Sequence, residues 1–271
     1  CFETNIMKQY FLFIFLSLIA SELIATSYDV EDLMPKQGKF RLYNDTSFVE
    51  TSTLLNDNYQ IIHNIELKYG INDKLFFGLT LNGFHSWDKF FQSGNFIEKN
   101  NQDYSEFITT LTTSYTPKSK DYGYIFTLNV PVFYNNFFYD DSNLIKEKLN
   151  FNYFETIASF YKIISPITAT IQLSYMNFLK EKYKRFENSD RIFLSSTINF
   201  AVNDDFTLFF GTRFDNLKKL KLDNVIIATE KNIITGVFGA MYEPSKNLIL
   251  QLSSSLNQSN STLNFSTTYK P

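Results

Sequence analysis

The chain has 271 residues, an aromatic content of 18% and a formal net charge of −3 at pH 7. This charge gives no electrostatic reason to expect nucleic acid as a partner. Two His and one Cys are too few for a transition-metal centre, so we expect no metal and no cofactor. The hydrophobic content of 44% is average, which indicates that the many aromatic residues lie on one face of each element.

The N-terminal residues are typical of an export signal. Met7–Tyr10 carries one positive charge, Phe11–Ala20 is an apolar run of ten residues, and Ala25–Ser27 is a suitable cleavage site. Such a run is too short for a stable transmembrane helix, although an N-terminal anchor is the alternative. We therefore expect an upstream extension and signal peptide (1–27, the signal itself being Met7–Ser27), a periplasmic lead-in (28–38) and the folded domain (39–271).

The segment Tyr59–Phe91 predicts two long strands joined by a tight turn. Apolar and polar residues alternate on both sides of Gly70–Asp73. A period of two is typical of strands with one apolar face. Both runs exceed the roughly five or six residues usual in soluble proteins and suit the roughly nine to eleven that a tilted membrane strand needs.

The same unit repeats along the chain. Short, turn-rich joins alternate with mostly longer, polar ones, as in bacterial transmembrane barrels, and this puts both termini at the periplasmic side. We therefore predict an all-β fold, a closed antiparallel transmembrane β-barrel of about twelve strands. The strands are expected at 39–50, 58–70, 74–88, 104–116, 122–134, 148–162, 167–180, 190–202, 206–217, 230–243, 247–257 and 261–270.

Two places depart from the simple pattern. Residues 148–164 lose clean alternation after Tyr153 and also fit helix spacing, and we interpret them as a strand with a bulge. Pro131 lies within an expected strand, where it removes a ladder hydrogen bond and predicts a local irregularity.

This layout resembles the outer-membrane β-barrel proteins of Gram-negative bacteria. The phrase Tyr69-Gly-Ile-Asn-Asp-Lys-Leu-Phe-Phe-Gly-Leu is similar to repeats in transporter-like barrels of the aromatic-degradation (phenol meta-pathway) type. The general likeness covers nearly all of the expected mature chain. It implies a place in the bacterial outer membrane and a porin-like transport function.

The strand positions that we expect to face the lumen include charged residues, which are candidates for a solute path. They would filter small solutes, or they would brace a closed lumen as ion pairs, since unpaired buried charge is expensive. Phe76, Phe133, Phe193 and Phe209 also occupy such positions and would narrow the bore. The charged residues are Arg41, Glu66, Lys68, Glu106, Arg191, Arg213 and Asp215.

These observations favour a channel or transporter for a small solute whose identity, like the oligomeric state, is not predicted. The alternative is a non-transporting scaffold for adhesion or lipopolysaccharide contact through the basic clusters Lys180–Arg185 and Lys218–Lys221. Outer-membrane lipid and lipopolysaccharide are the expected surroundings, and a soluble exported β protein is a further alternative. We expect no enzyme, because His85 and Ser86 point to opposite faces of a strand and supply no catalytic pair.

Overall fold

The computed structural model describes residues 35–52, 56–92, 95–115, 121–140, 143–179, 186–187, 190–222, 225–257 and 260–270. The expected signal peptide, the lead-in before residue 35 and the basic cluster at 180–185 lie outside these residues. Among the residues that are described, none belongs to a helix long and apolar enough to cross a membrane.

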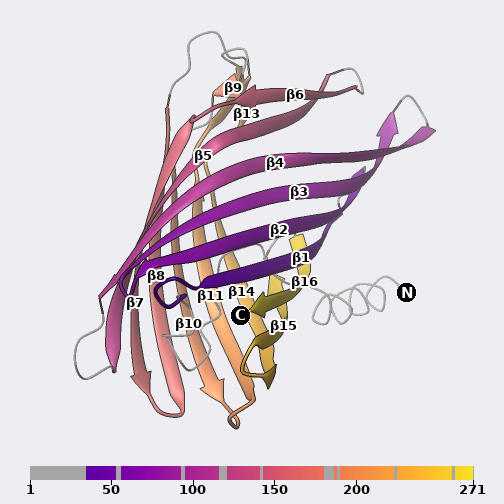
Figure 1. The fold of residues 1–271 in the computed structure, drawn as a ribbon. Helices are drawn as coiled ribbons and strands as arrows, with labels where there is room; N and C mark the ends of the chain where they lie inside the picture. The colour runs from indigo at the N-terminus through magenta and orange to yellow at the C-terminus, as the bar shows by residue number, and fades with distance from the viewer. Residues whose placement is uncertain are drawn as a thin grey trace, which may run out of the picture.

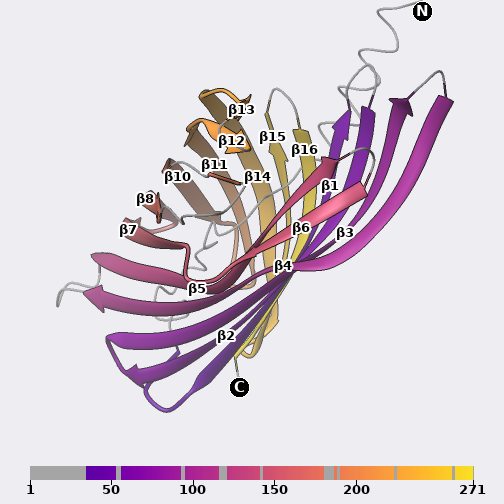
Figure 2. The ribbon, with the colours of Figure 1, turned by 90° about the horizontal axis from the view of Figure 1, so that it is seen from above.

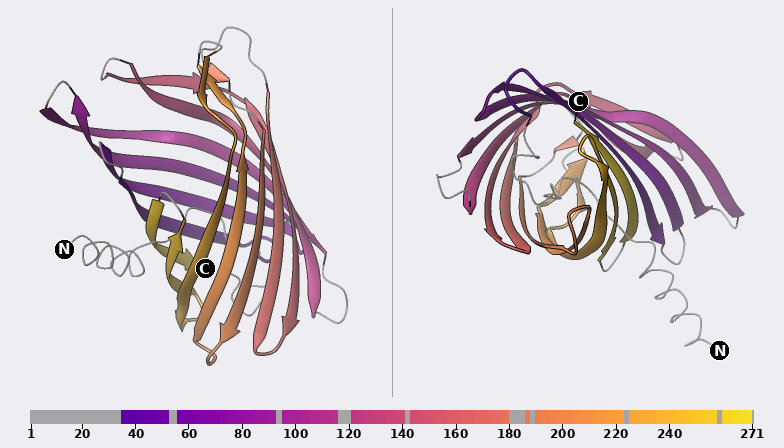
Figure 3. Two further views of the ribbon diagram at one scale, coloured as in Figure 1. Left: turned by 180° about the vertical axis from the view of Figure 1, so that it is seen from behind. Right: turned by 60° about the horizontal axis from the view of Figure 1, so that its bottom comes forward.

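Twelve strands close into one antiparallel ring, which confirms the predicted barrel. Each strand pairs with its neighbours in sequence order, and the pairs β1–β16 and β4–β5 complete the circle. Figure 1 shows β1–β5 crossing the wall formed by β7–β16 at a steep angle, and Figure 3 shows the ring from behind and from below. The ring strands are β1 (Phe40–Ser52), β2 (Asn56–Asn72), β3 (Leu75–Gln92), β4 (Asn95–Tyr115), β5 (Tyr122–Asp140), β7 (Tyr153–Ile164), β8 (Ile167–Phe178), β10 (Arg191–Ala201), β11 (Phe206–Leu217), β14 (Lys231–Ser245), β15 (Leu248–Leu256) and β16 (Asn260–Tyr269).

Four short strands extend the end of the barrel that carries the long connections. β6 (Asn143–Leu149) continues the ladder beside β5, while β9 (Phe186–Glu187), β12 (Leu220–Leu222) and β13 (Val225–Ala228) form a small separate sheet. Figure 2 shows β6, β12 and β13 from above. Much of the sequence predicted as loop at 92–103 and 135–147 is therefore strand, which corrects the prediction. Polar side chains do not stop a ladder, because its hydrogen bonds join backbone groups.

Burial alternates along the ring strands and gives the barrel an apolar outside and a polar inside. On the outside, Ile198 is 53% exposed, Phe210 is 59% exposed and Ile234 is 68% exposed. Thr197 and Asn199, which precede and follow Ile198 on β10, face inward and are buried. This polarity is opposite to that of a soluble domain and matches a barrel whose outer wall contacts lipid.

Pro131 produces a bulge that reverses the facing of the residues after it. Phe107 of β4 pairs with Phe133 of β5, but the next residue of β4, Ile108, pairs with Pro131. Val132 consequently has no partner on β4. Phe133 therefore pairs with outward Phe107, their ring centroids being 6.3 Å apart. The predicted irregularity is confirmed, but the predicted inward placement of Phe133 is wrong because an inserted residue inverts the alternation.

The expected single strand at 148–164 is two strands. β6 ends at Leu149, Phe151 has a φ of 50°, and β7 begins at Tyr153 with regular alternation of buried and exposed residues. The prediction placed the irregularity after Tyr153, and this placement is wrong: burial alternates regularly from Tyr153 onward, and the break lies before it, at Phe151.

The short-turn rim of the barrel also holds the start of β1 and the end of β16. Leu42 pairs with Tyr269, and Phe40 pairs with Tyr69 next to the β2–β3 turn. The lead-in folds against this rim: the Gly38 amide donates to the Gly70 carbonyl at 2.8 Å, and the Gly70 amide donates to the Lys39 carbonyl at 3.0 Å. This places Pro35, which is buried, at the lower end of the lumen.

Candidate functional site

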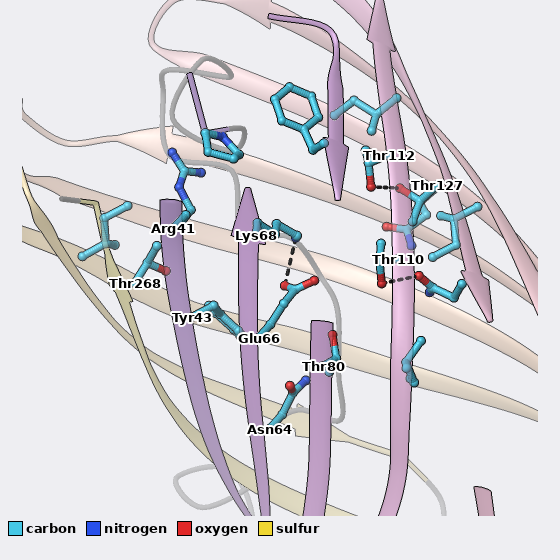
Figure 4. A pocket seen from close by; sticks show the side chains of 18 of the residues that line it. Arg41, Tyr43, Asn64, Glu66, Lys68, Thr80, Thr110, Thr112, Thr127 and Thr268 are labelled. Atoms are coloured by element: carbon cyan, nitrogen blue, oxygen red, sulfur yellow. Dashed lines mark hydrogen bonds and ion pairs between the residues drawn. The ribbon is translucent and has the colours of Figure 1, made fainter. Parts of the chain in front are cut away.

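The barrel encloses two adjoining chambers. Including the space open to solvent, the lower chamber, next to the short-turn rim, measures about 1240 Å³ and the upper chamber about 1120 Å³. Asn64, Ile108 and Gln172 line both, so the two spaces lie one above the other in the same lumen. Figure 4 shows side chains of β1, β2, β3 and β4 facing the lower chamber.

Two ion pairs are built within single strands. Glu66 Oε2 lies 2.9 Å from Lys68 Nζ on β2, and Asp215 Oδ1 lies 2.7 Å from Arg213 Nε on β11. Each pair joins residues two apart, which share a face of the sheet. Figure 4 shows the Glu66–Lys68 pair beside Arg41, which is 8% exposed and pairs in register with Lys68. The lower chamber thus carries two basic groups and one acidic group.

Neutral donors hold two carboxylates at the upper chamber. Glu106 Oε1 accepts from Asn82 Nδ2 at 2.7 Å, and Glu106 Oε2 accepts from Tyr153 Oη at 2.8 Å. Glu155 Oε2 accepts from Asn129 Nδ2 at 2.9 Å, and the Ser174 hydroxyl donates to Glu155 Oε1. Such bonds fix the position of a carboxylate without cancelling its charge.

The two upper arginines lie over aromatic rings. Arg191 Cζ is 5.7 Å from the centroid of Phe178, and Arg213 Cζ is 4.4 Å from the centroid of Phe193. These distances suit cation–π contacts, which hold a guanidinium beside the barrel wall.

The structure brings most of the predicted charged residues to the chambers. Arg41, Glu66 and Lys68 line the lower one, and Glu106 and Arg213 line the upper one. Arg191 and Asp215 lie on the same inward faces of β10 and β11, but they are not among the described residues lining either chamber.

Sequence reasoning missed Asp45 and Glu155, which both line the upper chamber. Asp45 follows Arg41 at the same parity on β1, so the rule that selected Arg41 also selects Asp45. Glu155 had no such signal, because the alternation of residue types around it is blurred. Its neighbours on the inward face of β7 are Tyr153 and Ile157, which are as apolar as the outward residues.

Apolar side chains narrow the lower chamber on one side. Phe209 and Met241 are almost fully buried and pack with Val237 and Ile249 on the inner face of β11, β14 and β15. Phe76, which is 2% exposed, also lines this chamber. Of the residues predicted to narrow the bore, Phe76 lines the lower chamber and Phe193 lines the upper one. Phe209 is buried on the inner wall but is not among the described residues that line either chamber.

The geometry around His85 provides no nucleophile–base pair. Its ring stacks on Trp87 with centroids 4.2 Å apart, whereas Ser86 is buried on the opposite face of β3. Within the ranges that the structure describes, no group of three His, Cys, Asp or Glu residues is placed to hold a metal ion.

Comparison with known proteins identifies the fold. No family model matches the chain, and no curated protein matches it. The COG4313 outer membrane channel from Pseudomonas putida F1 superposes with a TM-score of 0.69 at 10% identity, covering 94% of this chain and 100% of that chain. The NanC porin superposes with a TM-score of 0.52 at 8% identity, covering 85% of this chain and 100% of that one. The fold is that of an outer-membrane β-barrel.

Proposed function

We propose that the chain is a channel of the bacterial outer membrane through which small solutes diffuse. Two adjoining chambers with charged and polar walls support this proposal most directly. The apolar outer wall supports a membrane location, since a continuous exposed apolar band around a barrel is typical of a surface that contacts lipid. By the rule that short turns face the periplasm, the rim with Gly70 and Tyr269 would be periplasmic.

The solute path would follow the charged residues of the lumen. Arg41, Glu66 and Lys68 would act at the periplasmic end, and Glu106, Arg191, Arg213 and Asp215 would act farther out. Charged rings in a pore select ions by sign, so these residues would set the charge preference. Because the segment Tyr69–Leu79 is similar to repeats in barrels of the aromatic-degradation type, aromatic compounds are among the solutes to test.

The alternative is a barrel scaffold that binds lipopolysaccharide through its outer connections. The basic cluster Lys218–Lys221 is described, and within it Lys218 Nζ lies 2.6 Å from Glu230 Oε1. This pair reduces the positive charge that the scaffold would present to lipopolysaccharide phosphates.

Single-channel recording with cysteine labelling tests the channel directly. The chain has no cysteine after Cys1, so a single introduced thiol is unique in residues 28–271. Thr112 lines the lower chamber, whereas its neighbour Thr113 is exposed on the outer face of β4. A charged thiol reagent should reduce the conductance of Thr112→Cys and leave that of Thr113→Cys unchanged.

The outcomes separate the two functions. Conductance blocked only in Thr112→Cys supports a solute path through the lower chamber. Conductance that neither variant alters contradicts this path, and no conductance from correctly inserted protein favours the scaffold.

A further inference from the structure

Three oxygen acceptors form a row on the inner wall of the upper chamber. Asp45 on β1 pairs in register with Asn64 on β2, and Asn64 pairs in register with Asn82 on β3. All three side chains line the upper chamber. Directly opposed residues have Cβ atoms roughly 4.5–5.5 Å apart, so the row is compact enough for one small ligand to contact neighbouring members.

Each member of the row has an oxygen without a hydrogen-bond donor. These atoms are Asp45 Oδ1, Asn64 Oδ1 and Asn82 Oδ1, and each is buried from solvent. The Asp45 residue is 4% exposed, and its other oxygen accepts from Ser47 Oγ at 3.4 Å. The side chains of Asn264 and Tyr43 also lie close to this carboxylate, so a ligand donor would join neighbours that are already polar. Asn82 donates its Nδ2 to Glu106, which fixes its Oδ1 as the remaining acceptor.

Several other described side-chain oxygens of the barrel also have no donor, among them those of Thr197 and Asn199. The row differs in that its three acceptors lie on neighbouring strands around one chamber, where a ligand with N–H or O–H groups could contact more than one of them.

The charge of the chamber selects among such ligands. Asp45, Glu106 and Glu155 line it, and the donors described above for the two glutamates are neutral. Among the described lining residues the guanidinium is that of Arg213, which is paired with Asp215. The charge of Arg191 on the inward face of β10 acts on Glu106, so Asp45 and Glu155 carry the remaining acidic excess. This excess of acidic groups attracts cations, because a narrow low-dielectric wall strengthens the field of its fixed charges.

We propose that the Asp45–Asn64–Asn82 row is a binding site for the ammonium group of small protonated primary amines. This assignment rests on the proposed channel function and makes the row a step on the solute path. A primary ammonium carries three N–H donors and one positive charge, which match several acceptors beside a carboxylate. An ion without N–H donors, such as tetramethylammonium, satisfies the charge but not the acceptors.

Reversal potentials in planar bilayers test the site with methylammonium chloride and tetramethylammonium chloride gradients. The wild-type channel should favour methylammonium over both chloride and tetramethylammonium. In Asp45→Asn the preference over tetramethylammonium should fall roughly tenfold, as expected for the loss of a charged hydrogen bond. Glu98→Gln removes the same charge from an exposed position on the β3–β4 extension and should leave the preference unchanged.

A second variant and a second readout cover the cases in which Asp45→Asn does not fold or no current flows. Asn64→Leu removes a neutral acceptor and should weaken the methylammonium preference without changing net charge. In detergent, methylammonium should raise the unfolding temperature of the wild-type protein more than tetramethylammonium at equal ionic strength, and Asn64→Leu should reduce this difference.

The channel and the amine site can fail separately. If no current flows but methylammonium specifically raises the unfolding temperature, the channel proposal is overturned and the amine site is supported. If neither the reversal potential nor the unfolding temperature of the wild-type protein differs between methylammonium and tetramethylammonium, the amine site is overturned, whatever the conductance.

Discussion

Arg213 and Asp215 form an ion pair within β11, with Nε and Oδ1 2.7 Å apart, while the Arg213 guanidinium lies over the ring of Phe193. The pair lies at the inner wall, and Arg213 lines the upper chamber. Each side chain therefore partly neutralises the charge that the other presents to a passing ion. Together they determine how strongly this part of the lumen prefers cations or anions.

Removing one member of this pair should shift charge selectivity in opposite directions. We expect Arg213→Ala to favour cations and Asp215→Asn to favour anions. Each shift should be about fivefold, because a unit charge about 4 Å from an ion is worth about 1 kcal/mol in water. Reversal potentials in a potassium chloride gradient measure both shifts.

The double variant Arg213→Ala/Asp215→Ala is the matched control, since it leaves the net charge unchanged. Its selectivity should return close to that of the wild-type channel. Shifts of the same sign in both single variants would contradict the assigned role of the pair.

Phe209 should limit the width of the lower chamber by supporting Met241 and Ile249, which line it. Its side chain packs with Val237 and Met241, and a Cβ added to Gly239 would lie 2.6 Å from the end of its ring. We expect Phe209→Ala to raise single-channel conductance. It should destabilise the barrel by up to about 3–5 kcal/mol, less where the new space fills with water.

The control for this change is the next residue along β11. Phe210 faces outward and is 59% exposed, so Phe210→Ala should leave conductance unchanged. Equal conductance for Phe209→Ala and the wild-type channel would show that another part of the lumen limits the current.

Much of this barrel could be predicted because alternation depends on local geometry alone. Glu66 and Lys68 were assigned inward from their parity on β2, and the structure pairs them there at 2.9 Å. The same rule failed at Phe133, since the bulge at Pro131 inverts the facing of the residues that follow. A proline signals an irregularity, but the register that results depends on pairing with β4.

The network around Glu155 could not be predicted from sequence. Its partners Asn129 and Ser174 come from the neighbouring strands β5 and β8, and the register of those pairs follows from closure of the whole ring. The polar hairpin extensions were missed for a different reason. Hydropathy shows where a strand stops contacting lipid. The backbone ladder between β3 and β4 continues past that point, from the pair Asn82–Glu106 to the pair Gln92–Asn95.

A charge on the outer wall should destabilise the barrel according to its depth. Leu252 lies midway along β15, faces outward and is 54% exposed. We expect Leu252→Arg to lower the free energy of unfolding in lipid vesicles by about 2–4 kcal/mol, and Tyr269→Arg at the rim by only about 0–1 kcal/mol. Denaturant titrations measure both, with Leu252→Ala separating the added charge from the lost leucine. Equal values at the two depths would argue against a lipid-facing wall.

Gly70 should hold the lead-in across the lower end of the lumen. A Cβ at this position would collide with the Lys36 carbonyl oxygen and lie 2.6 Å from that of Pro35. These are backbone atoms, so the lead-in has to move away to admit an alanine, breaking the hydrogen bonds that Gly38 and Lys39 form with Gly70. Because Pro35 lines the lower chamber, Gly70→Ala should widen the rim and raise conductance.

Limited proteolysis gives an independent measurement of the same displacement. Trypsin should cleave after Lys36 and Lys39 faster in Gly70→Ala than in the wild-type protein, since a detached segment fits a protease site more readily. Gly236→Ala is the matched control, because a Cβ there meets no atom within 4 Å. If the two variants are cleaved at equal rates and conduct equally, close packing at Gly70 does not hold the lead-in in place.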